Sequence, residues 1–168
     1  NIKNAYSFTS HISVYETCAL QYKFYKELGF APVRAAAMLF GTLVHQTIED
    51  VHKAILRGET DRVNDTNISI WFESNYISLS KTEHSYLGQG QKDAALKQVL
   101  NYVERQRGDW DKIQAAEVDV SLVQPDYIIE GTVDLVKGEG DTYELVDFKS
   151  EKKPDIFADA DRLERYRR

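Results

Sequence analysis

The sequence contains a single cysteine, Cys18, among its 168 residues. One cysteine excludes an internal disulfide framework and any zinc site built from several cysteines, and it is typical of a reducing compartment. The chain also lacks an apolar run near the roughly 20 residues that a bilayer-spanning helix needs, and Asn1 does not open a signal-like segment. We therefore expect a cytoplasmic protein that is neither membrane-bound nor secreted.

The chain also lacks the excess of positive charge found in proteins that coat nucleic acid by bulk electrostatics. It has 21 lysines and arginines against 27 acidic residues, a net charge of −6. Residues 123–150 carry seven acidic and two basic side chains, whereas residues 1–58 have a net charge of +2. A local acidic site is still compatible with a nucleic-acid enzyme, because a divalent cation can bridge carboxylates to phosphate groups.

The hydrophobic pattern predicts one folded domain over residues 1–168, with helices first and strands last. The chain is 42% hydrophobic and 29% charged, as in ordinary globular proteins. Apolar spacings of three and four predict helices over 12–29, 35–56, from about 67 to the polar stretch 80–91, over 93–107, and from 155 onward. Period-two alternation predicts strands over 115–122, 127–136 and 142–149, with a hairpin loop at 137–141. This order predicts an α/β (α+β) fold.

The last two predicted strands carry acidic residues at positions that interrupt apolar runs. Residues two apart share a face of a strand, so Asp147 and Lys149 should point the same way. Asp134, on the preceding strand, comes within reach of the same ion as Asp147 if the hairpin turns around its glycines, although the sequence does not fix the register. Neighbouring carboxylates repel, and a hard cation such as Mg²⁺ or Mn²⁺ neutralises them.

Lys149 beside such an ion can polarise an attacking water or stabilise charge on a phosphoryl oxygen. The alternative is an exposed Asp147–Lys149 salt bridge with no catalytic role.

Among the histidines, His45 has the most suggestive context. It borders the apolar stripe of the predicted helix 35–56, Glu49 follows one turn later on the same face, and Gly41 permits another backbone to approach closely. The alternative is a solvent-facing or hydrogen-bonded core histidine. His52 lies on nearly the same face farther along and is expected at the surface, whereas Cys18 is expected in the core.

Four segments in this order resemble the RecB-like branch of the PD-(D/E)xK nuclease superfamily. More narrowly, they are similar to the nuclease domain at the C-terminal end of UvrD-type superfamily 1 DNA helicases. The segments are the opening 7–24, Phe40–His45 (Gly-x-x-x-His), Gly131–Asp134 (Gly-x-x-Asp) and Val146–Ser150 (Asp-x-Lys). Pro125-Asp126 also spells part of the superfamily's name, but it lies at a turn with no Asp-x-Lys at a matching distance.

The resemblance implies a restriction-endonuclease-like core, with a small and mostly antiparallel sheet flanked by helices, that hydrolyses DNA phosphodiester bonds with Mg²⁺. Carried over to this chain, Asp134 and Asp147 would hold the metal together with His45 and the backbone carbonyl of Phe148. Lys149 would orient or activate the water.

The resemblance also implies supporting groups and partners. Glu117 resembles a recurrent acid of the family and, with Glu49, is expected to support the metal ligands without binding the ion. The implied role is an exonuclease module working with a superfamily 1 helicase in the same polypeptide or complex. No phosphate loop of the type Gly-x-x-x-x-Gly-Lys-Ser/Thr occurs, so the chain itself holds no helicase motor.

Two features of the family are missing. Members usually continue with a helix carrying Gln-x-x-x-Tyr, and the chain ends at Arg168, where that motif should begin, which predicts a domain truncated at this end. Some relatives bind an iron–sulfur cluster through a cysteine near Cys18 and three later cysteines. Those later cysteines are absent, so no cluster is expected in this chain.

DNA, single-stranded or at duplex ends, is the expected partner. Basic side chains are candidates for tracking its backbone: Lys23, Lys26, Arg34, Arg162, Arg165, Arg167 and Arg168. Tyr22, Phe24 and Tyr25 are candidates for stacking on bases. Two alternatives stay open, namely a catalytically inactive nuclease-like domain that binds DNA or docks a helicase, and an unrelated metal-binding or interaction domain.

Overall fold

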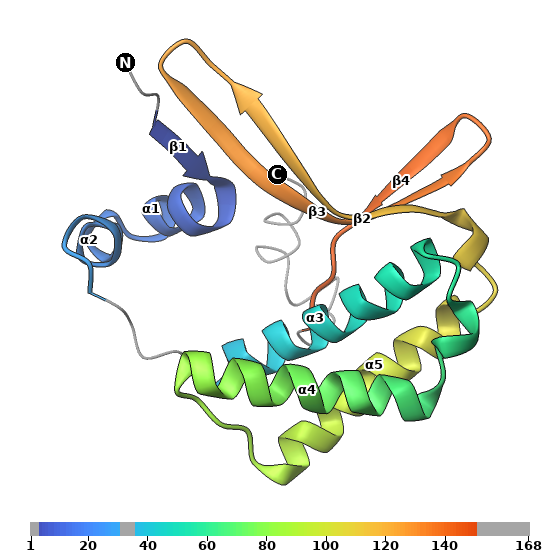
Figure 1. Ribbon diagram of the computed structural model, residues 1–168. Helices are drawn as coiled ribbons and strands as arrows, with labels where there is room; N and C mark the ends of the chain where they lie inside the picture. Colours follow the sequence, from blue (N-terminus) through green and yellow to red (C-terminus); the bar gives the residue numbers. More distant parts are fainter. Residues whose placement is uncertain (1–3, 31–35, 151–168) are drawn as a thin grey trace, which may run out of the picture.

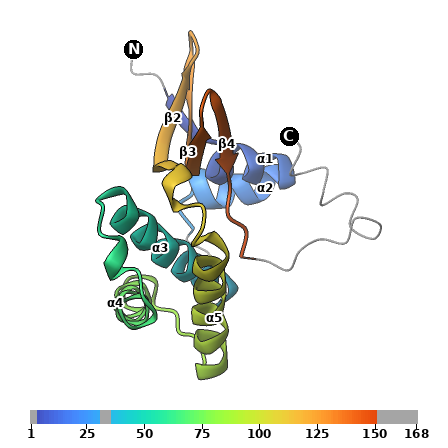
Figure 2. The same ribbon diagram turned by 90° about the vertical axis from the view of Figure 1, so that its right-hand side faces the viewer.

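The computed structural model describes residues 4–30 and 36–150. Three long helices, α3 (Ala36–Leu56), α4 (Asp65–Glu83) and α5 (Gln89–Gln106), pack together in the lower half of the molecule in Figure 1. The strands and a short N-terminal helical segment lie above them, and Figure 2 shows the same arrangement from the side. The α/β expectation, with a small and mostly antiparallel sheet flanked by helices, is confirmed.

The three long helices carry most of the core. The buried face of α3 includes Leu39, Leu43, Ile48 and Val51, which recur at helical spacing and meet apolar side chains of α4 and α5. The helix ends at Leu56, as the predicted range 35–56 has it. Gly58 has a φ of +77°, and the backbone N–H groups of Gly58 and Glu59 donate to the carbonyls of Ile55 and Ala54 in the last turn.

The boundaries of α4 and α5 differ modestly from the prediction. Asn64 caps α4 by accepting the amide hydrogen of Asn67, one turn before the predicted start. The polar stretch 80–91 contains the last turn of α4 and the first turn of α5, so the crossing between the helices is shorter than expected.

The sheet is built around β3 (Tyr127–Glu139). β2 (Ile113–Val123) and β4 (Thr142–Val146) pair with it antiparallel, and β1 (Asn4–Ser7) pairs with it parallel. The predicted hairpin loop at 137–141 is too long. Strand β3 continues to Glu139, and Gly140, which has a φ of +60°, makes the turn. The third strand also stops earlier than predicted, at Val146. The predicted turn at Pro125-Asp126 is confirmed at the tip of the β2–β3 hairpin.

The N-terminal segment is helical but not the single helix predicted over 12–29. It consists of short pieces, η1 (Phe8–Ile12), α1 (Ser13–Thr17), α2 (Ala19–Tyr22) and η2 (Lys23–Glu27). Cys18 is extended and interrupts the segment between α1 and α2. The expectation of a core cysteine is wrong: Cys18 is exposed, because none of these pieces buries a residue.

Some predicted features lie outside the described residues, namely Arg34, the tail helix from 155 and the arginines within that tail. Within residues 4–30 and 36–150, no helix combines the length and apolarity needed to cross a membrane.

Candidate active site

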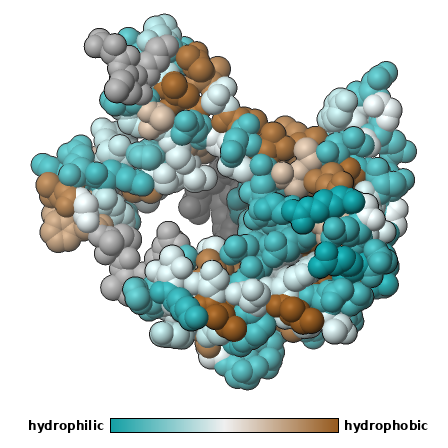
Figure 3. Space-filling model, in the orientation of Figure 1, coloured by the Kyte–Doolittle hydropathy of each residue, from teal (hydrophilic) through white to brown (hydrophobic). Residues whose placement is uncertain are grey.

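A cleft of about 910 Å³ brings together the N-terminal segment, α3, the middle of β3 and the residues that follow β4. In Figure 3 the surface is hollowed between the N-terminal helices and α3. The polar side chains that line the cleft are mainly acidic or hydroxylic, and His45 and Lys149 add nitrogen groups. Four predicted site residues line it: His45, Asp134, Asp147 and Lys149.

The strand register places three acidic residues in one row across the sheet. Ala116 pairs with Leu135 and Val118 with Val133, so Glu117 lies opposite Asp134. On the other side of β3, Leu135 pairs with Val146, and Asp147 follows directly, where the hydrogen bond from the Phe148 N–H keeps the chain beside Asp134. Neighbouring strands are about 5 Å apart, so the row gathers carboxylates from three consecutive chain segments.

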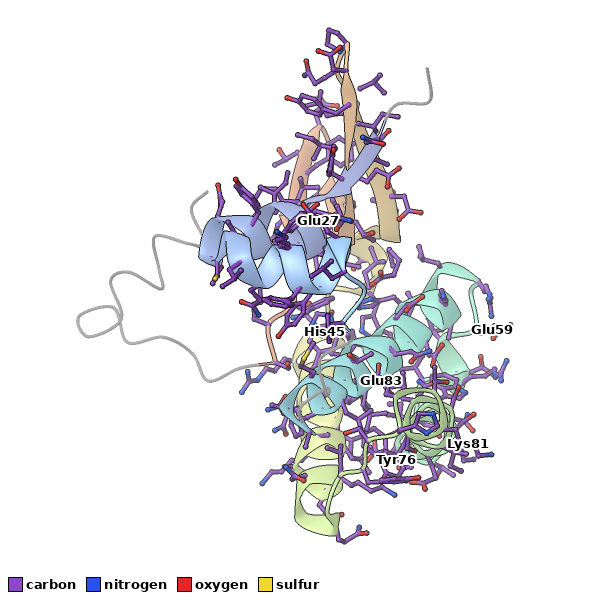
Figure 4. All side chains as sticks on the ribbon, turned by 90° about the vertical axis from the view of Figure 1, so that its left-hand side faces the viewer. Glu27, His45, Glu59, Tyr76, Lys81 and Glu83 are labelled. Atoms are coloured by element: carbon purple, nitrogen blue, oxygen red, sulfur yellow. The ribbon has the colours of Figure 1, made fainter. Side chains whose placement is uncertain are left out.

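Asp134 is at the centre of this row and is the most enclosed of the predicted ligands. Its side chain is 15% exposed, and Oδ2 accepts a 2.6 Å hydrogen bond from the backbone N–H of Phe148. His45 Nδ1 lies 3.9 Å from the same oxygen. Figure 4 shows His45 projecting from α3 toward the N-terminal segment and the strands. Helix α3 and strand β3 therefore meet at this carboxylate.

Asp147 and Lys149 face the same way, as the predicted alternation requires, although both lie beyond the end of β4. Lys149 Nζ donates to Asp147 Oδ1 at 2.8 Å and lies 2.6 Å from Oδ2. Both side chains are largely exposed to the cleft. The lysine therefore offsets the charge of Asp147, which is the more exposed of the two aspartates.

Glu117 combines an unusual backbone with an unusual charge environment. Its φ of +51° is in the left-handed region, which costs a non-glycine residue about 1–3 kcal/mol and is most often found at functional sites. Partial burial raises the pKa of its carboxyl group, and the nearby charges of Glu49 and Asp134 raise it further. Glu49 accepts a hydrogen bond from Lys53, which places a positive charge behind the acidic row. Glu117 and Glu49 are therefore both close to the site.

The expectation that His52 lies at the surface is wrong. The residue is 1% exposed, its Nε2 is hydrogen-bonded to the Tyr102 hydroxyl at 2.8 Å, and its ring stacks on Phe148. Burial, together with the positive charge of Lys137, lowers the pKa of His52 to about 4. Burial also raises the pKa of the Tyr102 hydroxyl. The imidazole is therefore neutral and the hydroxyl protonated at neutral pH.

Sequence reasoning missed this arrangement because Tyr102 is 50 positions away on α5. The sequence did contain one signal of it. Gly41, His45, Ile48 and His52 follow one another at intervals of four, three and four, so they share one face of α3. Only the packing of α5 against α3 converts that face from exposed to buried.

The donor set has the chemistry that a hard divalent cation prefers. Carboxylate and carbonyl oxygens suit Mg²⁺ or Mn²⁺, and an imidazole suits Mn²⁺. Within the described residues, no three His, Cys, Asp or Glu side chains are grouped tightly enough to ligate one ion as they stand. The Asp147 carboxylate is paired with Lys149 instead.

A family model for the PD-(D/E)XK nuclease superfamily matches residues 8–165 of the chain. The protein therefore belongs to this superfamily, whose members are nucleases that generally use divalent metal ions. Comparison with curated proteins gave no match, and comparison with solved structures gave none. Of the residues in the two acidic segments that resemble the superfamily, Asp134, Asp147 and Lys149 line the cleft, whereas Pro125-Asp126 is at the hairpin tip.

Proposed function

We propose that the protein is a Mg²⁺-dependent deoxyribonuclease of the RecB-like type, acting as an exonuclease module with a superfamily 1 helicase. The observation that carries the nuclease assignment is the Asp134 carboxylate at the centre of the acidic row, tied to the Asp147–Lys149 segment by the Phe148 amide. The order of the sequence motifs supports the RecB-like assignment. The helicase partnership is a prediction from the same resemblance.

The residues divide the chemistry between them. Asp134 and Asp147, with His45 and the Phe148 carbonyl, would hold a divalent ion, which lowers the pKa of bound water and offsets charge on the phosphate. Lys149 would orient or activate the attacking water, and the exposure of its side chain to the cleft supports this role. A preorganised ammonium also stabilises the negative charge that grows on the phosphoryl oxygens.

The open cleft suits a flexible nucleic-acid strand. Phe8 lines it and is 47% exposed, so its ring is available to stack on a base. Phe24 on η2 is also exposed, and Lys23 and Lys26 on the same piece supply positive charge. These groups on the N-terminal segment would guide DNA toward Asp134.

The test is incubation of the protein with end-labelled single-stranded and duplex DNA in Mg²⁺, Mn²⁺ or EDTA. We expect degradation with either metal and none with EDTA. An exonuclease that acts on one end should give a ladder of shortened products when the opposite end carries the label, and should release the label at once when its own end carries it. The His45→Ala variant should lose this degradation, whereas the control variant His84→Ala, altered at the end of α4, should retain it.

A catalytically inactive nuclease-like domain is the second candidate, and the Asp147–Lys149 ion pair is the observation that favours it. Retained DNA binding without degradation in either metal would support this candidate and contradict the first.

A further inference from the structure

The Asp147–Lys149 segment carries two of the proposed functional groups but has little support from the sheet. Strand β4 ends at Val146, so the ladder of backbone hydrogen bonds stops just before Asp147. The segment nevertheless keeps the alternation of a strand. Asp147 and Lys149 are exposed, whereas Phe148 and Ser150 are half-buried on the opposite side. Contacts on that inner side must fix the segment.

The inner side is anchored by three aromatic rings from two helices. The Phe148 ring stacks on His52 with centroids 5.6 Å apart and meets the edge of Tyr102 at 5.1 Å. A third ring, His45, lies edge-on at 6.1 Å. Aromatic pairs at these separations favour a defined mutual orientation over a range of loosely packed ones. The Phe148 ring is therefore packed between α3 and α5.

The two rings that contact Phe148 from α3 and α5 are also joined to each other. The hydrogen bond between His52 Nε2 and the Tyr102 hydroxyl joins α3 to α5 under the Phe148 ring. His52 is almost fully buried, so its ring cannot move away without disturbing the core. One residue farther on, Ser150 reaches α3 at Gly41, where a methyl group would come within 2.9 Å of its hydroxyl oxygen. The chain from Phe148 to Ser150 therefore lies close to α3.

We propose that His52 and Tyr102 are positioning residues, which hold Phe148 so that its backbone and the flanking Asp147 and Lys149 are presented to Asp134. This inference rests on the proposed function. A rigid supporting layer matters for such a site, because a displacement of about 1 Å in a catalytic group can lower the rate about 100-fold.

The test compares Tyr102→Phe and Phe148→Leu with Phe72→Leu in the full chain. Phe72 is a buried core residue of α4, and this helix lies on the side of α3 away from the strands (Figure 1), so its variant is a control for loss of aromatic packing far from the segment. Three quantities are measured: amide hydrogen exchange of the peptide 146–150, the affinity for Mn²⁺ by calorimetry, and kcat and KM for DNA cleavage.

We expect Phe148→Leu to accelerate exchange in this peptide at least tenfold, to weaken Mn²⁺ binding about fivefold or more, and to lower kcat while KM for DNA stays within twofold. Tyr102→Phe should change the same quantities in the same direction by a smaller factor. Phe72→Leu should leave all three within twofold, even where its melting temperature falls as far as that of Phe148→Leu.

Equal responses of Phe148→Leu and Phe72→Leu would overturn the inference, because the effect would then be general destabilisation. Should Phe148→Leu fail to fold, Tyr102→Phe decides alone, since it keeps the ring and removes only the hydroxyl group. A wild-type protein that does not cleave DNA contradicts the proposed function, whereas the exchange of peptide 146–150 still supports or overturns the positioning role.

Discussion

The backbone N–H of Phe148 donates a 2.6 Å hydrogen bond to Asp134 Oδ2 and so connects the two acidic motifs of the chain directly. The donor belongs to the segment after β4, and the acceptor belongs to the middle of β3. A change at either residue therefore alters the position of the other, and the two carboxylates of the site, Asp134 and Asp147, cannot be considered independently.

Replacement of Asp134 by asparagine should raise stability in the absence of metal. The substitution removes one of the like charges beside Glu117, and the amide oxygen of asparagine can still accept the Phe148 N–H. We expect the melting temperature in EDTA to rise by roughly 2 °C, and the further rise caused by Mg²⁺ to shrink. Asp126→Asn, at the hairpin tip, is the control and should change neither value. A variant that melts lower both with and without Mg²⁺ would show that the Asp134 charge is structural.

Replacement of Lys149 by alanine should abolish cleavage and leave metal binding intact. The ammonium group is not a metal ligand, and its loss frees both oxygens of Asp147 from the ion pair. We expect kcat to fall about 100-fold or more, with Mn²⁺ affinity unchanged or higher in a calorimetric titration. Lys112→Ala removes a lysine from surface ion pairs with Asp109 and Glu139 and should retain full activity. Undiminished cleavage by Lys149→Ala would exclude this residue from the mechanism.

Replacement of Glu117 by glycine should stabilise the protein and impair the site. Glycine adopts the left-handed φ of +51° without strain, and the crowding of Glu117 with Glu49 and Asp134 disappears. We expect the free energy of unfolding in urea to rise by about 1 kcal/mol, after the flexibility that glycine adds to the unfolded chain is allowed for. Activity should fall in the same protein. A loss of stability instead would mean that the Glu117 side chain makes a net stabilising contribution.

Stability should fall as the pH drops from about 6.5 to about 4, because His52 is buried in its neutral form. The pKa of His52 is lowered from 6.5 to about 4 in the folded protein, so over this interval the unfolded chain binds a proton that the folded protein does not. The full effect is about 3 kcal/mol and is reached near pH 4. Urea unfolding of the wild type and of His52→Gln at several pH values isolates it, because the carboxyl groups common to both proteins cancel in the difference. A difference that does not vary with pH would contradict the prediction.

The local pattern of the sequence was sufficient for α3 and for the hairpins. Spacings of three and four on α3 and period-two alternation on β2 and β3 arise from the repeat of each element, so neighbouring residues encode them. The same patterns identified His45, Asp134, Asp147 and Lys149 as candidates, because a polar group that interrupts an apolar run is conspicuous in the sequence alone. All four line one cleft, and their roles there stay predictions.

Other features depended on contacts between distant segments. β1 has only four residues and little alternation of its own, and it is a strand because it pairs with β3 more than 120 positions away. The register that aligns Glu117, Asp134 and Asp147 follows from how three strands pair. His52 was placed on the correct face of α3 but at the surface, since its partner Tyr102 is on α5.

The sequence by itself determined the long helices, the hairpin strands and the polar side chains that interrupt them, because these are properties of short stretches of chain. The tertiary structure alone decided which of those side chains meet, which ring is buried under Phe148, and how deeply each carboxylate is enclosed. Burial and strand register are set by free energies summed over packed elements, and no short stretch of sequence contains them.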